Sequence, residues 1–268
     1  MEEQCILAFD VGNTSLKCAV RAHGRWHRLA AVPTGPVRNL KERIAQALPA
    51  RKARSLRPGR CVASSVCPAA DGAVRAYWRA VGAGGEAEFF GTGLPVAILT
   101  RLRQPRQAGA DRLLLALGAR ELHGAPCIVV GAGTAITVDL VDPEGAFVGG
   151  AIAPGFRLAA RALHEMTALL PAVEPARPRS PAGRDTVSAI QSGIYWSCAG
   201  GVLALVEQLR KEPGCARARL ICTGADAPLL LPALPQRSLR HEPDLIFHGM
   251  SAALGLPVRS PARHRRTA

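Results

Sequence analysis

The residues with the clearest chemical potential form one short stretch between two apolar segments, Asp10-Val11-Gly12-Asn13-Thr14-Ser15-Leu16-Lys17. A carboxylate at the end of a strand can coordinate Mg²⁺, and a glycine lets backbone N–H groups approach phosphate oxygens. Small polar side chains beside them can donate hydrogen bonds. The stretch therefore predicts a phosphate-binding loop, with an ordinary tight turn as the alternative, because Asp, Gly and Asn also favour turns for local backbone reasons.

A second stretch, residues 130–138, repeats this arrangement further along the chain. When the two stretches are aligned, Gly133 falls on Gly12, and each glycine is followed by small residues and then by an apolar strand. Two such loops would suit a nucleotide held between two similar halves of a protein. One position differs, because Gly131 stands where the first stretch has Asp10.

A third group of candidate residues is Gly109-Ala110-Asp111-Arg112, which opens an apolar segment that reaches Leu122 and is predicted to be a buried helix. A carboxylate can accept the proton of an attacking alcohol, and an arginine can pair with a carboxylate through two hydrogen bonds. The alternative is that Asp111 caps its helix and Arg112 is surface charge. Thr186 is either a further polar contact or only an N-terminal helix residue.

The elements that must position these residues fall into two similar α/β halves. Each half is predicted to begin with a three-strand antiparallel meander and to continue with helices and one further apolar strand. The strands are expected at residues 5–9, 16–21, 26–32 and 61–66, and again at 127–130, 136–140, 146–152 and 219–222, with short strands at 87–90 and 96–99. Helices are expected at 40–48, 73–81, 113–122, 157–169, 185–209 and 245–254.

The connections between these elements suggest two domains. Residues 51–60 are basic and contain Pro58-Gly59, so they are predicted to be a surface loop, and residues 171–183 are predicted to be an exposed connection. We expect an N-terminal domain over residues 1–108 and a C-terminal domain with substrate and dimer contacts over 109–268. The basic tail that contains Arg259–Arg266 is expected to be loose.

Composition narrows the class of protein. The chain has 268 residues, 48% of them hydrophobic, which is enough to bury a core in each of two domains. Its net charge of +14 comes mainly from scattered arginines, and only 4% of residues are aromatic, so a nucleic-acid partner is not expected. The eight cysteines form no C-x-x-C pair and fit small buried residues in a reducing compartment. Neither a signal peptide nor a membrane span is indicated, and a cytoplasmic protein is expected.

The motifs taken together resemble a known family. No P-loop or dinucleotide-fold signature is present, whereas the paired hairpin loops resemble those of the acetate and sugar kinase, actin and heat-shock chaperone superfamily. That resemblance implies two duplicated actin-like ATPase (ribonuclease H-like) domains with a nucleotide cleft between them. The ordered set of motifs is similar to that of type III pantothenate kinases. It comprises residues 10–17, 109–112, 133–137 and 150–155, and Thr186.

The resemblance implies ATP-dependent phosphorylation of pantothenate to 4'-phosphopantothenate, the first step of coenzyme A biosynthesis. In that reading Asp10 to Lys17 bind the ATP phosphates, Asp10 also binds Mg²⁺, and Thr134 contacts ATP. Gly109 to Arg112 bind pantothenate, with Asp111 as general base and Arg112 as partner for the substrate carboxylate. Thr186 is a further substrate contact, and the family resemblance implies a homodimer whose interface completes the site.

Two positions depart from the family pattern. Gly131 replaces an aspartate associated with the monovalent cation, K⁺ or NH₄⁺, and Leu102 replaces a tyrosine of the substrate pocket. Two alternatives therefore stay open. One is a catalytically weak or inactive member that acts as an accessory or regulatory protein, and the other is a kinase for another small hydroxy acid.

Overall fold

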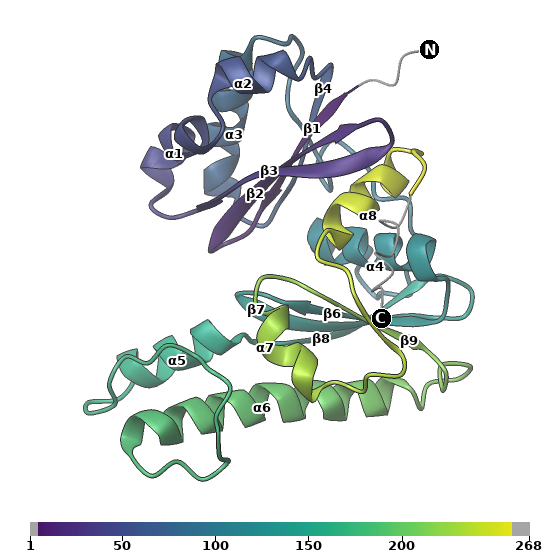
Figure 1. Cartoon of the computed structure of the whole chain (residues 1–268). Helices are drawn as coiled ribbons and strands as arrows, with labels where there is room; N and C mark the ends of the chain where they lie inside the picture. Colours follow the sequence, from purple (N-terminus) through teal and green to yellow (C-terminus); the bar gives the residue numbers. More distant parts are fainter. Residues whose placement is uncertain (1–4, 259–268) are drawn as a thin grey trace, which may run out of the picture. The chain divides into compact units, whose positions relative to one another are not determined.

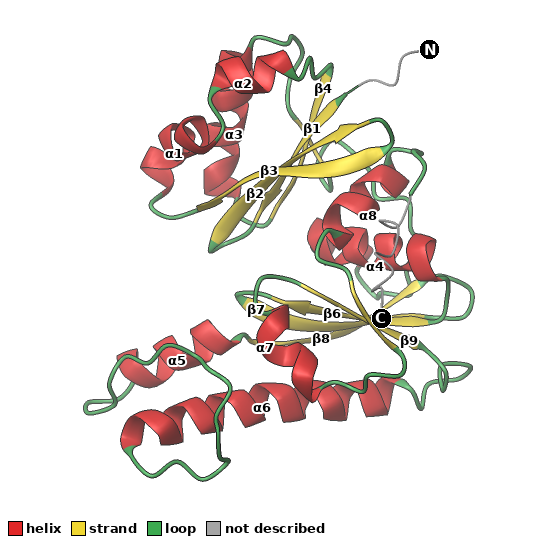
Figure 2. Cartoon of the chain, in the orientation of Figure 1, coloured by secondary structure: helices red, strands yellow, loops and turns green. Residues whose placement is uncertain are grey.

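The computed structural model describes residues 5–258, which divide into two compact units (Figures 1 and 2). Among these residues, the first unit comprises 5–97, 109–122 and 246–258, and the second comprises 98–108 and 123–245. The predicted basic tail lies outside the described residues. Each unit contains one five-stranded sheet.

The sheet of the first unit has the strand order β3-β2-β1-β4-β5. β1 pairs antiparallel with β2 and parallel with β4, and β2 pairs antiparallel with β3. The bounds of these strands are β1 Ile6–Val11, β2 Ser15–Ala22, β3 Arg25–Pro33, β4 Arg60–Ser65 and β5 Glu88–Phe89. The helices of this unit are η1 Val37–Asn39, α1 Leu40–Ala47, α2 Ala50–Ser55, α3 Pro68–Val81, nearly all of α4 Ala110–His123 and nearly all of α8 Leu245–Ala253.

Helices cover both faces of this sheet. Because side chains alternate along β1, successive residues of this strand pack against different helices. Leu7, Phe9 and Val11 pack in one core with residues of α1 and α3. Ile6 and Ala8 point the other way and pack with residues of α4 and α8. The same alternation places the side chain of Asp10 on the face that α4 and α8 cover.

The second unit repeats this topology with the strand order β10-β9-β6-β7-β8. β6 again pairs antiparallel with its successor β7 and parallel with β9, as β1 does with β2 and β4. The strands are β6 Cys127–Ala132, β7 Ala135–Val141, β8 Phe147–Pro154, β9 Arg219–Thr223 and β10 Leu239–His241. The remaining helices are η2 Pro105–Gln107, α5 Phe156–Glu165, α6 Thr186–Leu209, α7 Ala227–Leu230 and η3 Leu231–Ala233.

The long helix α6 forms much of the core of the second unit. Within residues 5–258 it is the one helix whose length and hydropathy would also suit a membrane span. Its Ile190, Ile194 and Val202 are buried, and they belong to a core cluster that includes Val130 of β6 and Leu220 of β9. Packing against the sheet explains the apolar residues on the buried face of α6, whereas Val187 and Trp196 are exposed.

The predicted α/β fold with two duplicated halves is confirmed, and several elements differ in detail. Residues 50–55, predicted as part of a loop, form α2, because Ala53 is buried and Nε of Arg54 donates to the carbonyl of Val81 at 2.7 Å. The predicted strand at 96–99 is irregular, and only the neighbouring Thr100 forms an isolated bridge, with Phe147. The short elements α7 and β10 gave no recognisable sequence pattern. The compact units also interleave along the chain instead of following the predicted ranges 1–108 and 109–268, since α4 and α8 pack on the first sheet.

Candidate active site

The first predicted loop joins β1 to β2 and is closed by a backbone hydrogen bond from the N–H of Gly12 to the carbonyl of Ser15, at 3.0 Å. The strand register sets Asp10 opposite Lys17. Nζ of Lys17 lies 3.2 Å from Oδ2 of Asp10, and the two side chains are 24% and 18% exposed. A carboxylate and an ammonium are therefore both presented at the loop with partial access to solvent, as a bound metal and phosphate would require.

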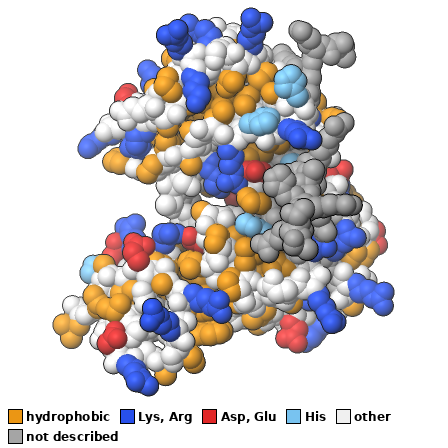
Figure 3. Space-filling view, viewed as in Figure 1, with side chains coloured by type: hydrophobic (Ala, Val, Ile, Leu, Met, Phe, Trp, Pro, Cys, Tyr) orange, Lys and Arg blue, Asp and Glu red, His pale blue; other side chains and the backbone are white. Residues whose placement is uncertain are grey.

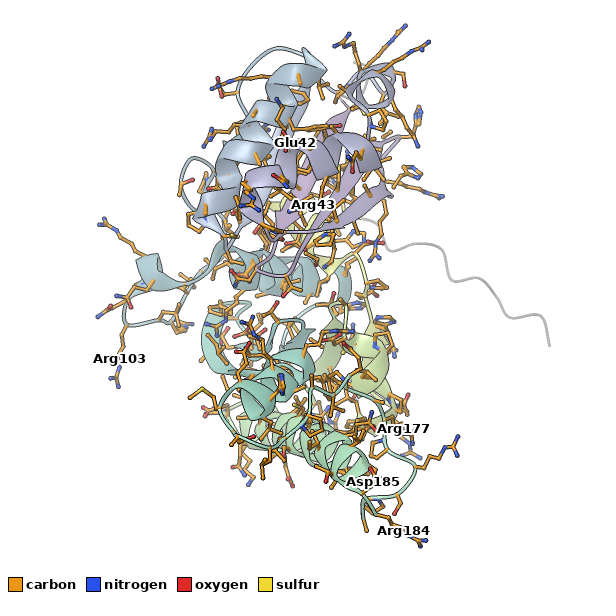
Figure 4. The ribbon with its side chains drawn as sticks, turned by 90° about the vertical axis from the view of Figure 1, so that its left-hand side faces the viewer. Glu42, Arg43, Arg103, Arg177, Arg184 and Asp185 are labelled. Atoms are coloured by element: carbon orange, nitrogen blue, oxygen red, sulfur yellow. The ribbon has the colours of Figure 1, made fainter. Side chains whose placement is uncertain are left out.

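Two residues that no sequence pattern predicted, Thr34 and Arg43, support this loop through hydrogen bonds. The buried Thr34, which follows β3, donates from its hydroxyl to the carbonyl of Gly12 at 2.7 Å and from its N–H to the carbonyl of Thr14 at 3.0 Å. Arg43 of α1, labelled in Figure 4, donates to the carbonyls of Thr34 and Pro36, both at 2.8 Å. No local motif marks these residues, because they reach the loop only once β3 and α1 are in place.

The Gly109 to Arg112 segment begins α4, with Asp111 in the first turn as predicted. A Cβ at Gly109 would lie 2.4 Å from Oδ1 of Asp111, so a larger residue there would force the Asp111 carboxylate to move. Asp111 and Arg112 are half-buried. Leu114, one turn further on, packs in the same cluster as Ile6 and Ala8 of β1, so α4 covers the face of the sheet that carries Asp10.

The second loop joins β6 to β7 and has the same closure, from the N–H of Gly133 to the carbonyl of Ala135 at 3.1 Å. It is one residue shorter than the first, because only Thr134 separates Gly133 from Ala135. The registers of the two sheets make Gly131 the equivalent of Asp10. Its neighbours across the sheet are Thr137 of β7 and Thr223 of β9.

Two glycines pack tightly against the second loop. A Cβ at Gly155, before α5, would lie 2.1 Å from the carbonyl oxygen of Gly133, and a Cβ at Gly224 would lie 2.1 Å from that of Ala132. Gly224 also has a φ of +105°, which favours glycine. The loop backbone is therefore enclosed by the segment before α5 on one side and by the segment after β9 on the other.

An ion pair links these two enclosing segments. The guanidinium of Arg157, in the first turn of α5, donates to the carboxylate of Asp226, which follows Gly224 in the chain. The Asp226 side chain is 7% exposed and that of Arg157 is 56% exposed. The N–H of Asp226 in turn donates to the carbonyl of Ala132 at 3.0 Å. This contact was also missed from the sequence, because the paired residues are far apart along the chain.

Thr186 is exposed at the start of α6, where Asp185 forms a capping box with Ser188 (Figure 4 labels Asp185 and Arg184). The N–H and hydroxyl of Ser188 lower the pKa of Asp185. Thr186 lines an apolar groove of about 970 Å³ between α5 and α6, together with Met166, Leu170 and Ile194. It therefore lies at a surface suited to contact another molecule rather than inside the core.

Leu102, which the family resemblance assigns to the substrate pocket, lies in a loop of the second unit. A Cβ added at Gly149 of β8 would be 3.1 Å from Cδ2 of Leu102, so this side chain packs against the sheet. The next residue, Arg103, points away into solvent (Figure 4). Leu102 can supply apolar contact but no hydroxyl.

The candidate metal ligands differ between the two loops. Within residues 5–258, no group of three or more His, Cys, Asp or Glu side chains is arranged to hold a metal. Asp10 fits a largely hydrated Mg²⁺, which is commonly bound through one or two carboxylates and substrate phosphates. At Gly131 no side chain can bind a monovalent cation, and the neighbouring Thr137 and Thr223 offer hydroxyls without charge.

The cysteines behave as the sequence predicts. Cys18 and Cys61 are buried in the first core, and burial raises the pKa of both thiols. Burial likewise raises the pKa of Cys222 to about 12. These side chains serve as small apolar residues and not as reactive thiolates.

The basic side chains are scattered over the face shown in Figure 3 without forming one patch.

The two duplicated halves place the chain among proteins with an actin-like fold. It is similar to MreB5 of Spiroplasma citri bound to ADP, with a TM-score of 0.51, 10% identity and coverage of 94% of this chain and 96% of that one. A protein from Campylobacter jejuni described as a Baf family transcriptional activator gives a TM-score of 0.57 at 16% identity, covering 93% and 97% of the two chains. At these identities the likeness shows the actin-like fold alone.

Sequence comparison is more specific. The pattern that defines the type III pantothenate kinase family matches residues 6–208. The type III pantothenate kinase of Maricaulis maris is 37% identical over 215 residues, 77% of this chain and 81% of that protein. The protein of the same name from Rhodococcus jostii is 43% identical over 162 residues, covering 59% of this chain and 58% of its own length. The chain belongs to the type III pantothenate kinase family, as its motifs suggested.

Proposed function

We propose that the protein transfers the γ-phosphoryl group of ATP to the hydroxyl of pantothenate, giving 4'-phosphopantothenate. One observation carries this proposal: the Asp10 to Lys17 loop and the first turn of α4, which contains Asp111, belong to the same compact unit, and Asp10 lies on the sheet face that α4 covers. A metal ligand and a candidate base are then positioned by one rigid core, which suits a reaction that depends mainly on positioning and charge neutralisation.

Each candidate residue has a role in this proposal. Asp10 would hold Mg²⁺, and Lys17, which pairs with Asp10 in the free protein, would then be available to the ATP phosphates. The backbone and the polar side chains between Gly12 and Ser15 contact phosphate oxygens, while Thr134 contacts ATP from the second loop. Asp111 accepts the proton of the pantothenate hydroxyl, and Arg112 binds the pantothenate carboxylate.

The proposal departs from the family resemblance at the monovalent cation. The family resemblance implies activation by K⁺ or NH₄⁺, but Gly131 supplies no carboxylate, and its strand neighbours Thr137 and Thr223 offer only neutral oxygens. We propose that the kinase works without a monovalent cation bound at this position. An accessory or regulatory protein that binds ATP without turnover remains the second candidate, favoured by the changes at Gly131 and Leu102.

A turnover assay with ATP, Mg²⁺ and pantothenate tests the proposal. The wild-type protein should form 4'-phosphopantothenate, and Asp111→Asn should lower kcat about 10²- to 10⁴-fold with an unchanged melting temperature. A kinase for another hydroxy acid would show ATP consumption with a different acceptor. Wild-type protein that binds ATP but phosphorylates no acceptor would support the accessory role instead.

We also propose a homodimer in the cytoplasm. Large apolar side chains are exposed on the second unit, among them Met166 and Leu169 after α5 and Trp196 on α6, which are 83%, 91% and 49% exposed. These residues and the groove beside Thr186 suit a partner surface, and through it Thr186 could reach substrate in the partner's site. Light scattering should give twice the chain mass for wild type, and Trp196→Glu should give a monomer with reduced turnover. A monomeric, active wild type would contradict the dimer alone.

A further inference from the structure

A buried hydroxyl beside Asp10 has no assigned role. Ser64 of β4 is 1% exposed, and among residues 5–258 no hydrogen-bond partner lies within reach of its Oγ. Buried polar groups in proteins are nearly always hydrogen-bonded, because an unmade bond leaves the cost of desolvation uncompensated. An isolated hydroxyl in this position therefore calls for a partner that is not another side chain of the core.

The strand register places Ser64 next to the candidate metal ligand. β1 and β4 are parallel, and Ser64 is the residue opposite Asp10 on the neighbouring strand. Neighbouring strands lie about 4.8 Å apart, and residues paired in this way point to the same face of the sheet. Val62, two residues earlier, packs with Ile6 and Ala8 on that face, which confirms the direction of Ser64.

The next residue, Ser65, shows that a serine at the end of this strand can form a hydrogen bond. Ser65 points to the opposite face, and its Oγ accepts a hydrogen bond from the N–H of Cys67 at 3.2 Å. The adjacent hydroxyl is thus locally satisfied, whereas the one on the Asp10 face is not. This contrast associates the free hydroxyl with the site and provides a matched control.

We propose that Ser64 is a positioning residue for the metal: its hydroxyl hydrogen-bonds a water molecule of the hydrated Mg²⁺ that Asp10 binds. Mg²⁺ retains several of its waters in proteins, so residues around it act mostly through those waters. Outer-shell partners orient the ligands and tune metal affinity. The inference rests on the proposed role of Asp10, and it assigns the buried hydroxyl a partner once the Lys17 side chain leaves Asp10 and water reaches the strand.

The proposal predicts opposite effects on the free protein and on the metal complex. Removal of an unsatisfied hydroxyl removes a desolvation cost, so Ser64→Ala should leave the melting temperature of the free protein unchanged or raise it. Loss of an outer-shell contact should at the same time raise the Mg²⁺ concentration for half-maximal effect about tenfold. A residue with only a structural role would not weaken metal binding while keeping or improving stability.

The experiment titrates Mg²⁺ against ADP binding, measured by calorimetry, and against turnover in parallel. Wild type, Ser64→Ala, Ser64→Thr and Ser65→Ala are compared, with melting temperatures of the free proteins. We expect the Mg²⁺ requirement to rise in Ser64→Ala only, and Ser64→Thr, which keeps the hydroxyl, to stay close to wild type. Ser65→Ala should keep the wild-type Mg²⁺ requirement even if its local turn is weakened.

Two results would overturn the proposal. One is a Ser64→Ala protein with the wild-type Mg²⁺ requirement, and the other is a Ser64→Ala protein whose free form is clearly destabilised. The binding measurement separates this inference from the proposed function: wild type that binds Mg²⁺ and ADP without phosphorylating pantothenate would refute the kinase assignment but still test Ser64. Wild type in which Mg²⁺ has no effect on ADP binding would refute the role of Ser64 and that of Asp10 together.

Discussion

The β1–β2 loop and the β6–β7 loop occupy equivalent places in two sheets of the same topology, yet they are built differently. The first loop carries charge, with Asp10 and Lys17 opposite each other at 3.2 Å. The second has Gly131 and Thr137 at the corresponding positions and no charged side chain of its own. Instead, Gly155 and Gly224 pack closely against its backbone carbonyls, with no room for a Cβ.

A duplicated loop therefore need not keep the chemistry of its counterpart. Phosphoryl transfer needs a metal ligand close to the transferred group, while other phosphate contacts can come from a rigid backbone. The first loop is suited to the former task and the second to the latter. Substitutions of charge should therefore matter most in the first loop, and substitutions of glycine should matter most for the second.

Among the substitutions that test the difference between the two loops, the largest effect is expected from Asp10→Asn. This change keeps the size of the side chain and removes the charge that would hold Mg²⁺, so kcat/KM should fall about 10²- to 10³-fold. The assay is turnover at saturating Mg²⁺, with the melting temperature as control for folding. Turnover close to that of wild type would mean that the metal is not bound at Asp10, and the charge difference between the loops would then have no catalytic meaning.

Alanine substitution of the loop glycines gives the next largest effect, on stability. Gly224→Ala places a Cβ 2.1 Å from a backbone oxygen at positive φ, and it should cost about 2–4 kcal/mol in the free energy of unfolding. Gly12→Ala meets the carbonyl of Ser15 at 3.0 Å and should cost less. Gly200→Ala on α6, where no atom lies within 4 Å, is the control and should stabilise by up to about 1 kcal/mol.

Urea unfolding of these three variants measures the expected order. If Gly12→Ala proved more destabilising than Gly224→Ala, the second loop would not be the more tightly packed of the two. Tight packing would then not distinguish the second loop from the first.

A smaller effect is expected from the ion pair that joins the segments around the second loop. Arg157→Gln leaves the buried carboxylate of Asp226 without its cation, so the loop should loosen and the KM for ATP should rise about threefold to tenfold, with little change in the KM for pantothenate. Arg161→Gln is the matched control, because Arg161 lies on the same helix and pairs with Glu165 at 2.7 Å in a largely exposed position. Equal effects of the two variants would show that the Arg157 contact is ordinary surface charge.

The smallest effect is expected from potassium. Because Gly131 has no side chain, replacement of Na⁺ by K⁺ at constant ionic strength should change wild-type turnover little. Gly131→Asp should make turnover depend on K⁺, since it restores a carboxylate at the position equivalent to Asp10. Strong K⁺ activation of the wild type would show that backbone and hydroxyl oxygens near Gly131 suffice, and that the difference between the loops is not one of cation binding.

Much of the fold could be predicted from the sequence because its signals are local. The meanders follow from apolar strands joined by short polar turns, and α6 follows from a long apolar segment with Asp185 at its start. The capping position, the strand alternation and the repeated glycine loop all lie within a few residues of each other. The same holds for Gly109 and Asp111, which are two positions apart and so close that a Cβ at Gly109 would meet the Asp111 carboxylate.

Other features depend on contacts between distant segments, and local patterns could not reveal them. The helical state of residues 50–55 is supported by the contact of Arg54 with the end of α3. Thr34 and Arg43 support the first loop only because β3 and α1 return to it. The assignment of α4 and α8 to the first unit likewise comes from packing between segments that are far apart in the chain.

Residue type and order were sufficient to predict the family, the two loops, the candidate base and the missing carboxylate at Gly131. The contact between Arg157 and Asp226 and the burial of Ser64 beside Asp10 became visible only in the folded chain. The physical reason is the register of parallel strands and the packing of helices on them. Both bring together residues that no spacing along the chain relates, and they decide which polar groups find a partner.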